Sequence, residues 1–556
     1  MSQSGQSEDF GGDFAVLRSG MFSISCLSSL RTNSSTLLPS AAVRCHRTLI
    51  SSLVLGSAIL ITPGFIDVQP ARSQVPAQAT QETTGSVSLR DRLMGRIMGG
   101  GPGAWTPEQI ATMGKLRDEA IADPYALDEL RHLTDNIGPR ISGSKQAQTA
   151  VDYIAAEMRA LGAEVTLEKT SVPHWVRGVE TGAIVSWKGM AEGTTQKVIL
   201  TALGSSVATP PDGITAEVVV VDNWAQLKAL TAGSKGADAV KGKIILFNRK
   251  FDKQLAAQKG GEYAYGDAVV YRAAAPVVGA SVGAAAVLVR SVGGAEYRIP
   301  HTGQTEYAAG IEKIPAAAVT AEDADLLADL TSQGPVKMHL TLTPQTLPDA
   351  PSYNVIADWK GTEHPEQVVV VSGHLDSWDL GTGAIDDGAG VVVSMQAIHL
   401  MAKLGIHPRR TVRFIAWMAE EEGSQGAATY IAEHGKDAAN HIAAIESDMG
   451  AGHPDGVMYA GKPELEEWLQ PIAQALDPIK AQTFRSSPET GEDIEGLTQA
   501  GVPSFAPSQD GRYYFNYHHT PADTFDKVNP RELAENAAVM TVLAYALADS
   551  KEIAPR

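Results

Sequence analysis

The chain has 556 residues, too many for one ordinary hydrophobic core, so we expect two folded units with extensions. Its 44% hydrophobic and 20% charged residues are typical of a soluble globular protein. The formal net charge of -19 argues against nucleic acid as a partner, and both cysteines, Cys26 and Cys45, precede the expected folded body, which therefore offers no thiolate to a metal.

Residues 49–62, LISSLVLGSAILIT, form an apolar stretch that follows Arg44 and Arg47 and precedes small residues. This order is typical of a signal peptide, and the stretch is shorter than the roughly 20 residues that a membrane-spanning helix needs. An uncleaved anchor is the alternative. We expect residues 1–79 to be a leader with a signal peptide, and the mature protein to be exported, periplasmic or secreted, with no stable membrane insertion after cleavage.

Residues 80–124 are predicted to hold a linker and an N-terminal helix. The helix is expected at 106–122, TPEQIATMGKLRDEAIA, which has a threonine cap and a proline in its first turn. In residues 125–180 the pattern predicts two amphipathic helices around a turn at Gly138, and then a strand after Gly162.

The pattern changes in residues 181–347 to short strands and glycine-rich turns, such as AEVVVVDN and VKGKIILFN. We interpret this segment as a separate β-rich module. Within it, Gly279 and Gly283, followed by the Val-Leu-Val run at 287–289, favour a helix, a turn and a strand over one long helix.

Residues 348–556 repeat the order strand, loop, helix, with continuous apolar strands such as QVVVVSG. Such strands alternating with amphipathic helices predict an α/β fold, a three-layer sandwich with a mixed, largely parallel sheet. Ligands of these folds bind beyond the carboxyl ends of the strands.

Polar clusters follow three consecutive strands at that edge. They are His374, Asp376, Asp386 and Asp387 in GHLDSWDLGTGAIDDGAG, then Glu420, Glu421 and Glu422, and then Asp448. So many carboxylates in one crevice would repel each other unless cations compensated them. Imidazole with carboxylates and no thiolate suits Zn²⁺, with Mn²⁺ or Co²⁺ as alternatives, and shared carboxylates suggest two ions roughly 3.5 to 4 Å apart.

Two further imidazoles, His518 and His519, lie in DGRYYFNYHHTPADT, residues 510–524. Adjacent side chains are expected to point in different directions, so we expect at most one of the two to bind a metal and the other to line a pocket or pack. The spacing alone does not choose between them.

These clusters, with ESDMG and TGEDIEGLTQAGVP in the same order, resemble the M28 family of zinc exopeptidases, and most closely its carboxypeptidase Q branch, over residues 125–547. The resemblance implies the zinc-exopeptidase fold. It also implies that residues 181–347 are an inserted protease-associated domain, which separates two parts of one peptidase domain at 125–180 and 348–556.

The resemblance implies two Zn²⁺ ions per chain and five metal ligands. In the family pattern Asp386 bridges both ions, His374 and Asp448 complete one site, and His519 and Glu421 complete the other.

The resemblance also implies that Glu420 is the general base and that the Asp376 carboxylate accepts the free N–H of His374. His518 stands where others in the broader family carry a tyrosine that stabilises the oxyanion. It either donates that hydrogen bond or packs. For HTG at 301–303, a surface loop is expected, and a loop at the active-site mouth is the alternative.

We therefore expect an exported di-zinc exopeptidase that hydrolyses a terminal peptide bond of dipeptides or short peptides, as a dipeptidase or carboxypeptidase, with a homodimer left open. One alternative is an aminopeptidase on the same scaffold. An acyltransferase of the glutaminyl cyclase kind uses a single zinc, and the bridging Asp386 argues against it. A non-catalytic receptor is disfavoured because every ligand type and the base are present.

Overall fold

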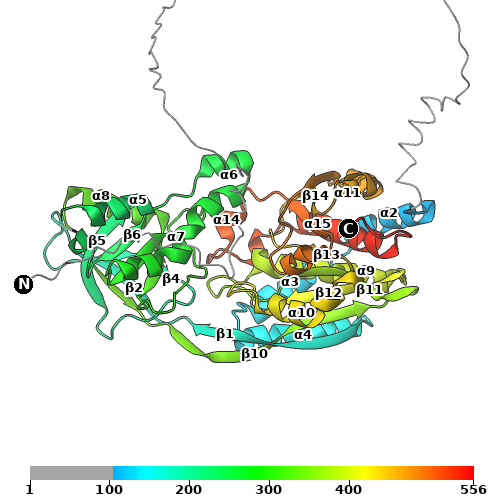
Figure 1. Cartoon of the computed structure of the whole chain (residues 1–556), viewed down its shortest axis with the longest axis horizontal. Coiled ribbons are helices and arrows are strands. Elements are labelled where there is room, and N and C mark those ends of the chain that lie inside the picture. The colour runs from blue at the N-terminus through cyan, green and yellow to red at the C-terminus, as the bar shows by residue number, and fades with distance from the viewer. Residues whose placement is uncertain (1–103, 235) are drawn as a thin grey trace, which may run out of the picture. The chain divides into compact units, whose positions relative to one another are not determined.

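Two eight-stranded sheets organise the described residues, 104–234 and 236–556, of this computed structural model (Figure 1). The predicted leader, its signal peptide, both cysteines and the linker up to residue 103 lie outside the described residues. Within the described part of the chain, none of the helices is both long and apolar enough to span a membrane.

The first sheet has the strand order β1-β10-β12-β11-β13-β16-β14-β15. Its four central strands, β12, β11, β13 and β16, are parallel, β1 and β10 pair antiparallel to their neighbours, and β14 pairs antiparallel with β16 and parallel with β15. The strands are β1 (Glu164–Val176), β10 (Gln345–Trp359), β11 (His364–His374), β12 (Arg410–Trp417), β13 (His441–Glu446), β14 (Pro454–Ala460), β15 (Thr483–Ser486) and β16 (Ser504–Gln509). The mixed, largely parallel sheet predicted for residues 348–556 is confirmed.

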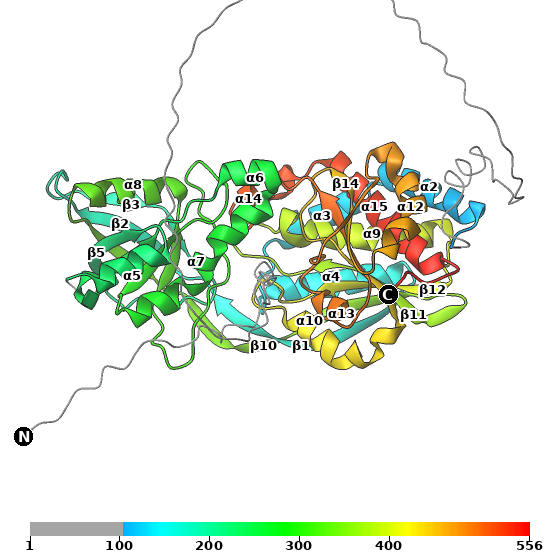
Figure 2. The ribbon, with the colours of Figure 1, turned by 45° about the horizontal axis from the view of Figure 1, so that its top comes forward.

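Helices cover both faces of this sheet, because alternate valines of β11 enter different cores. Val369 and Val371 pack in one core with α9 and α15, and Val368 and Val370 pack in the other with α10 and α13 (Figure 2). The first core contains α2 (Pro107–Ala122), α3 (Tyr125–Arg131), α4 (Lys145–Ala160), α9 (Ala389–Leu404), α11 (Glu464–Trp468), α12 (Gln470–Leu476) and α15 (Pro530–Asp549). The second contains α10 (Gln425–His434) and α13 (Glu495–Gln499). The three-layer prediction is therefore confirmed.

The second sheet has the order β3-β2-β9-β5-β6-β7-β8-β4, and its strands are β2 (Glu180–Ser186), β3 (Gln196–Val198), β4 (Leu200–Ala202), β5 (Ile214–Val221), β6 (Ile244–Phe247), β7 (Ala286–Arg290), β8 (Ala316–Val319) and β9 (Lys337–Leu342). Helices α5 (Trp224–Ala232) and α7 (Gly261–Ser281) pack on one face, and α8 (Ala321–Gln333) packs on the other. The short α6 (Lys253–Lys259) precedes α7. We call residues 180–342, which form this sheet and its helices, the insert. The description "β-rich" was incomplete, because helices bury both faces of the parallel strands β5 to β8.

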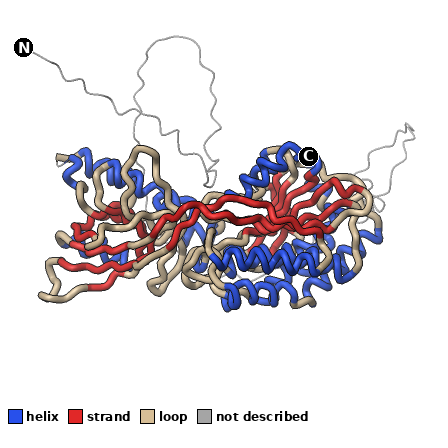
Figure 3. Tube along the Cα trace, turned by 90° about the horizontal axis from the view of Figure 1, so that it is seen from below, coloured by secondary structure: helices blue, strands red, loops and turns tan. Residues whose placement is uncertain are grey.

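The chain enters and leaves the insert along two paired strands. The antiparallel partners β1 and β10 run from Glu164 opposite Asp358 to Val176 opposite Gln345, with one register shift (Figure 3). The last paired residues, Val176 and Gln345, lie just outside β2 and β9. The two segments that connect the sheets are therefore hydrogen-bonded to each other up to the edge of this second sheet.

The predicted N-terminal helix is present as α2, and its cap explains where it starts. The Thr106 side chain accepts from the Gln109 amide, and the Gln109 side chain accepts from the Thr106 amide, a reciprocal capping box. The side-chain amide of Gln109 also donates to the backbone carbonyl and the carboxylate of Asp549 at the end of α15. The cap thereby ties the beginning of the described chain to its last helix.

A buried histidine at the start of β13 makes the stability of the fold depend on pH. The Tyr430 hydroxyl accepts from Arg413 and donates to His441 Nε2 at 2.8 Å, while His441 Nδ1 lies 3.3 Å from the Asp437 carbonyl. If His441 also carried a proton on Nε2, that N–H would face the Tyr430 hydroxyl, which itself donates toward Nε2. Burial lowers the pKa of His441 to about 4, against an ordinary value near 6.5.

We therefore expect the free energy of unfolding to fall on acidification, because between these two pKa values the unfolded chain binds the proton and the folded chain does not. From pH 7 to pH 5 the loss from His441 alone is about 2 kcal/mol. Denaturant unfolding of the unsubstituted protein and of His441→Gln at both pH values measures it. An unchanged difference between the two proteins at pH 7 and pH 5 would contradict the assignment.

Candidate metal centre

Three neighbouring parallel strands deliver the predicted residues to one edge of the first sheet. His374 is the last residue of β11, whose neighbours are β12 on one side and β13 on the other. The acidic run at 420–422 begins three residues after β12 ends, and Asp448 lies two residues after β13. The carboxyl ends of parallel strands meet at one edge, and the structure brings these side chains together there.

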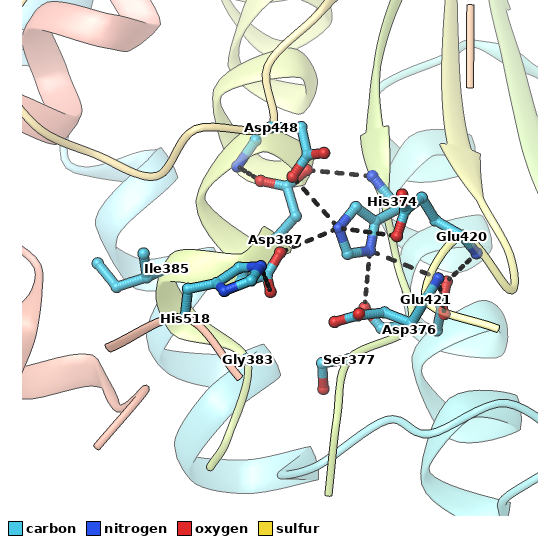
Figure 4. A network of polar contacts seen from close by, with 12 residues as sticks. His374, Asp376, Ser377, Gly383, Ile385, Asp387, Glu420, Glu421, Asp448 and His518 are labelled. Atoms are coloured by element: carbon cyan, nitrogen blue, oxygen red, sulfur yellow. Dashed lines mark hydrogen bonds and ion pairs between the residues drawn. The ribbon is translucent and has the colours of Figure 1, made fainter. Parts of the chain in front are cut away.

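One group of potential ligands surrounds the His374 ring, which is fully buried. Its Nε2 atom lies 3.2 Å from Asp386 Oδ1 and 3.3 Å from Asp448 Oδ1, with Glu420 Oε2 at 4.0 Å. Figure 4 shows the contacts that radiate from this ring to the carboxylates around it. His374, Asp386 and Asp448 form a group able to hold a metal ion.

A second group forms around His519 and shares one carboxylate with the first. His519 Nε2 lies 2.7 Å from Glu421 Oε2 and 3.2 Å from Asp386 Oδ2. The two oxygens of Asp386 therefore face different histidines, and each histidine has a second carboxylate of its own. The five residues that the family resemblance implied as ligands thus lie together, and their role as ligands stays a prediction.

The donor set fits divalent cations. Asp386 Oδ2, Glu421 Oε1 and Asp448 Oδ1 are buried oxygens without a hydrogen-bond donor. Burial raises the pKa of Glu421 to about 7 and raises the pKa of Asp448. Buried carboxylates without donors are costly, and bound cations would satisfy them.

The loop that carries Asp386 is held by a carboxylate that sequence reasoning missed. Asp523 is buried and accepts from the backbone amides of Ala384 at 2.9 Å, Ile385 at 2.6 Å and Asp386 at 3.2 Å. It lies in the quoted run YHHTPADT, four residues after His519. That position was the available signal, but sequence spacing does not reveal that its partners are backbone amides.

Asp376 does not act as predicted. The nearest acceptor to His374 Nδ1 is the backbone carbonyl of Asp376 at 3.0 Å, and its carboxylate oxygen lies 3.9 Å away. The carboxylate instead accepts from the amides of Ala419 at 2.7 Å, Glu420 at 3.2 Å and Glu421 at 3.3 Å. The turn after β12 presents three amides to this carboxylate, so Asp376 fixes the acidic run, and its carbonyl orients His374.

The two adjacent histidines do not point in different directions, so that expectation is wrong. Their rings stack, with centroids 3.6 Å apart and planes 16° apart. Both Nε2 atoms face Asp386 Oδ2, at 3.6 Å from His518 and 3.2 Å from His519. His519 has a left-handed backbone with φ 59°, and this unusual turn allows neighbouring side chains to lie on one side.

HTG at 301–303 is not a surface loop either. His301 is fully buried, and its Nε2 atom lies 3.2 Å from His518 Nδ1. His301, His518 and His519 form a third cluster of potential ligands. The loop belongs to the insert, so the insert contacts the candidate site directly.

Glu420 lies at the edge of the metal groups, with its side chain 14% exposed. Burial raises the pKa of Glu420 well above its ordinary value, and the carboxylates of Glu492 and Asp448 raise it further. A carboxyl that binds a proton readily beside a metal-binding group is suited to accept and return a proton. Tyr514, another residue outside the predictions, donates from its hydroxyl to Asp386 Oδ1 at 3.2 Å.

Comparison with known proteins agrees with this arrangement. Residues 354–544 match Peptidase family M28. The chain is 37% identical to carboxypeptidase Q of Bos taurus over 83% of this chain and 95% of that protein, and 37% identical to carboxypeptidase Q of Homo sapiens over 81% and 92%.

A solved structure is also similar. The crystal structure of a peptidase M28 precursor from Shewanella amazonensis SB2B is 35% identical, with a TM-score of 0.75, over 81% of this chain and 98% of that one. The similarity therefore extends over both sheets and beyond the segment matched by the family alone. Together with the site, these comparisons show that the chain belongs to peptidase family M28 and is a metallo-exopeptidase.

Proposed function

We propose that the protein is a di-zinc exopeptidase that hydrolyses the peptide bond of dipeptides and short peptides. The carboxylate of Asp386 carries this proposal, because its two oxygens each lie 3.2 Å from a different histidine nitrogen. A single carboxylate placed between two histidine and carboxylate pairs is the geometry that two neighbouring ions need.

In this proposal His374 and Asp448 would hold one ion, His519 and Glu421 would hold the other, and Asp386 would offer one oxygen to each. The ions supply Lewis acidity, which lowers the pKa of a water molecule and polarises the peptide carbonyl. The Asp376 carbonyl keeps the proton of His374 on Nδ1, so that Nε2 is free to bind.

Glu420 takes the proton of the attacking water and delivers it to the amine that leaves. The Asp376 carboxylate accepts from the backbone amide of Glu420 and so fixes the turn. This turn places the Glu420 carboxylate beside His374. The raised pKa of Glu420, caused first by burial, favours proton uptake by this carboxylate. His518, beside Asp386, is placed to donate a hydrogen bond to the carbonyl oxygen as negative charge develops there.

The charges around the site favour substrates with a free amino terminus. Arg140 is buried and donates to four backbone carbonyls, and Arg177 is paired with Asp379 and Glu180. These guanidinium groups are already satisfied. Burial raises the pKa of Glu492 to about 7, with a further contribution from Asp448, and we propose this carboxyl as the group that meets the substrate's ammonium.

Cleavage at a free amino terminus of longer peptides, as in an aminopeptidase, is therefore the second candidate. A free dipeptide satisfies both candidates, because it carries an ammonium group and a carboxylate on either side of one peptide bond. The relatives are named carboxypeptidase Q, and this name supports cleavage at the carboxyl terminus over cleavage at the amino terminus.

We also propose that the protein is exported, and that the insert is a protease-associated domain. The first proposal rests on the apolar stretch at 49–62 with basic residues ahead of it. The second rests on the position of the insert, between two paired strands of the catalytic sheet.

The experiment measures zinc per chain in the mature protein together with hydrolysis of free dipeptides, N-blocked peptides and aminoacyl-anilides. We expect close to two zinc ions per chain and cleavage of free dipeptides that stops on chelation. Cleavage of anilides would favour the aminopeptidase, and cleavage of N-blocked peptides the carboxypeptidase. Full zinc with an intact panel would refute the substrate class, and failure to bind zinc after reconstitution would refute the ligand assignment.

A further inference from the structure

The insert holds the backbone of the two adjacent histidines. The Thr302 amide donates to the His519 carbonyl at 2.9 Å, and the Gly294 amide donates to the Phe515 carbonyl at 2.8 Å. Gly303, with φ 128°, passes so close that a Cβ atom there would lie 2.8 Å from His519 Nδ1. The loop around His301 is thus fitted against the metal centre, although it comes from the other sheet.

Within this contact, one histidine of the insert faces one histidine of the site. His301 Nε2 lies 3.2 Å from His518 Nδ1, and the two residues are 0% and 7% exposed. The other ring nitrogen of His301, Nδ1, is buried and has no hydrogen-bond partner. The Thr302 carbonyl lies close enough to the His301 ring to favour its protonated form, but it accepts from Arg272 and does not have the geometry of a hydrogen bond with Nδ1.

This asymmetry decides which nitrogen carries each proton. If His518 Nδ1 donated, the proton of His301 would sit on Nδ1 as a buried donor without an acceptor, which is rare in folded proteins. The bare Nε2 of His518 would then also face the Asp386 carboxylate, lone pair against lone pair. If His301 Nε2 donates, both problems disappear, because the orphaned Nδ1 is then only an acceptor.

We propose that His301 is a positioning residue, which donates from Nε2 to His518 Nδ1 and so fixes His518 as the tautomer with its proton on Nε2. That N–H points toward Asp386 Oδ2 at 3.6 Å, too long for a hydrogen bond, and it remains available to a substrate oxygen. The catalytic part of this inference rests on the proposed function. It resolves the two roles left open for His518 in favour of the donor.

A third metal ion among His301, His518 and His519 is the competing interpretation of the same cluster. Arg272 opposes it, because its guanidinium lies 3.3 Å from His519 Nδ1 and is anchored by the Tyr265 hydroxyl at 2.6 Å. A cation beside that group would be repelled. Zinc content that drops on replacing His301 would overturn the positioning role.

The first test compares His301→Phe, which removes the donor, with His301→Gln, whose amide nitrogen restores it. On a free dipeptide we expect His301→Phe to lower kcat by about 10- to 100-fold with KM within about 3-fold, since the donor acts on charge that develops in the transition state. His301→Gln should recover kcat to within about 5-fold of the unsubstituted protein. Equal losses in both variants would overturn the proposal.

Two controls separate positioning from damage to the fold. His339→Phe alters an insert histidine that lies against Thr215 and Thr341 and should leave kcat unchanged. In a His518→Phe background, His301→Phe should lower kcat no further, because the residue acts only through His518. A further loss in that background would show a structural effect and contradict the inference.

The second test does not depend on turnover. In protein labelled with ¹⁵N-histidine, two-bond ¹H–¹⁵N correlation spectra show which ring nitrogen carries the proton, and the His518→Phe spectrum assigns the signals. We expect His518 with its proton on Nε2, and a mixture of tautomers in His301→Phe. A proton on Nδ1 of His518 would overturn the inference. An inactive protein with the expected spectrum would instead contradict the proposed function alone.

Discussion

Replacing Glu420 with glutamine is expected to lower kcat on a free dipeptide by about 10²- to 10⁴-fold while zinc content stays unchanged. The amide fills the same space but cannot take a proton from the attacking water. Since Glu420 Oε2 lies 4.0 Å from His374 Nε2, farther than the carboxylates of Asp386 and Asp448, its loss should not release an ion. Steady-state kinetics and metal analysis of the same preparation check both parts.

The matched control lies two residues along the same turn. Glu422 is 4% exposed, and burial raises its pKa well above the ordinary value, which favours the neutral carboxyl that an amide imitates. Glu422→Gln should therefore keep kcat within about 3-fold. If Glu422→Gln is as inactive as Glu420→Gln, the loss reflects damage to the turn, and another group must serve as base.

The sequence predicts the catalytic sheet well, because its signals are local and strong. The run Val368–Val371 alternates between two buried cores, and this pattern requires helices on both faces. The order strand, loop, helix then implies parallel neighbours, which bring His374 and Asp448 to one edge. Periodicity is less informative for the insert: the helix, turn and strand predicted around Gly279 and Gly283 are present as α7 and β7, but the pattern did not predict that helices cover both faces of β5 to β8.

The parts of the site that escaped prediction depend on contacts between distant segments. Asp523 binds backbone amides almost 140 residues earlier in the chain, and a backbone amide has no signature in a sequence. His301 reaches His518 across the boundary between the two sheets. The stacking of the adjacent histidines depends on one positive φ at His519, a backbone conformation that is uncommon for any residue other than glycine.

Replacing the shared carboxylate tests the count of ions most directly. In Asp386→Asn we expect zinc to fall from close to two per chain to nearly none, because one side chain faces both His374 and His519. Activity should fall by at least about 10³-fold, since the attacking water and the peptide carbonyl lose their Lewis acids together. The loop itself should persist, because Asp523 holds its backbone and not its side chain.

The matched comparison variant for this experiment is Asp448→Asn. Asp448 lies beside His374 only, so its loss should remove about one ion and leave the pair of His519 and Glu421 able to bind the other. Both variants are analysed after dialysis against the same free zinc concentration, with thermal unfolding to confirm the fold. If Asp386→Asn keeps as much zinc as Asp448→Asn, the Asp386 carboxylate serves only one ion, and the proposed bridge between two ions is contradicted.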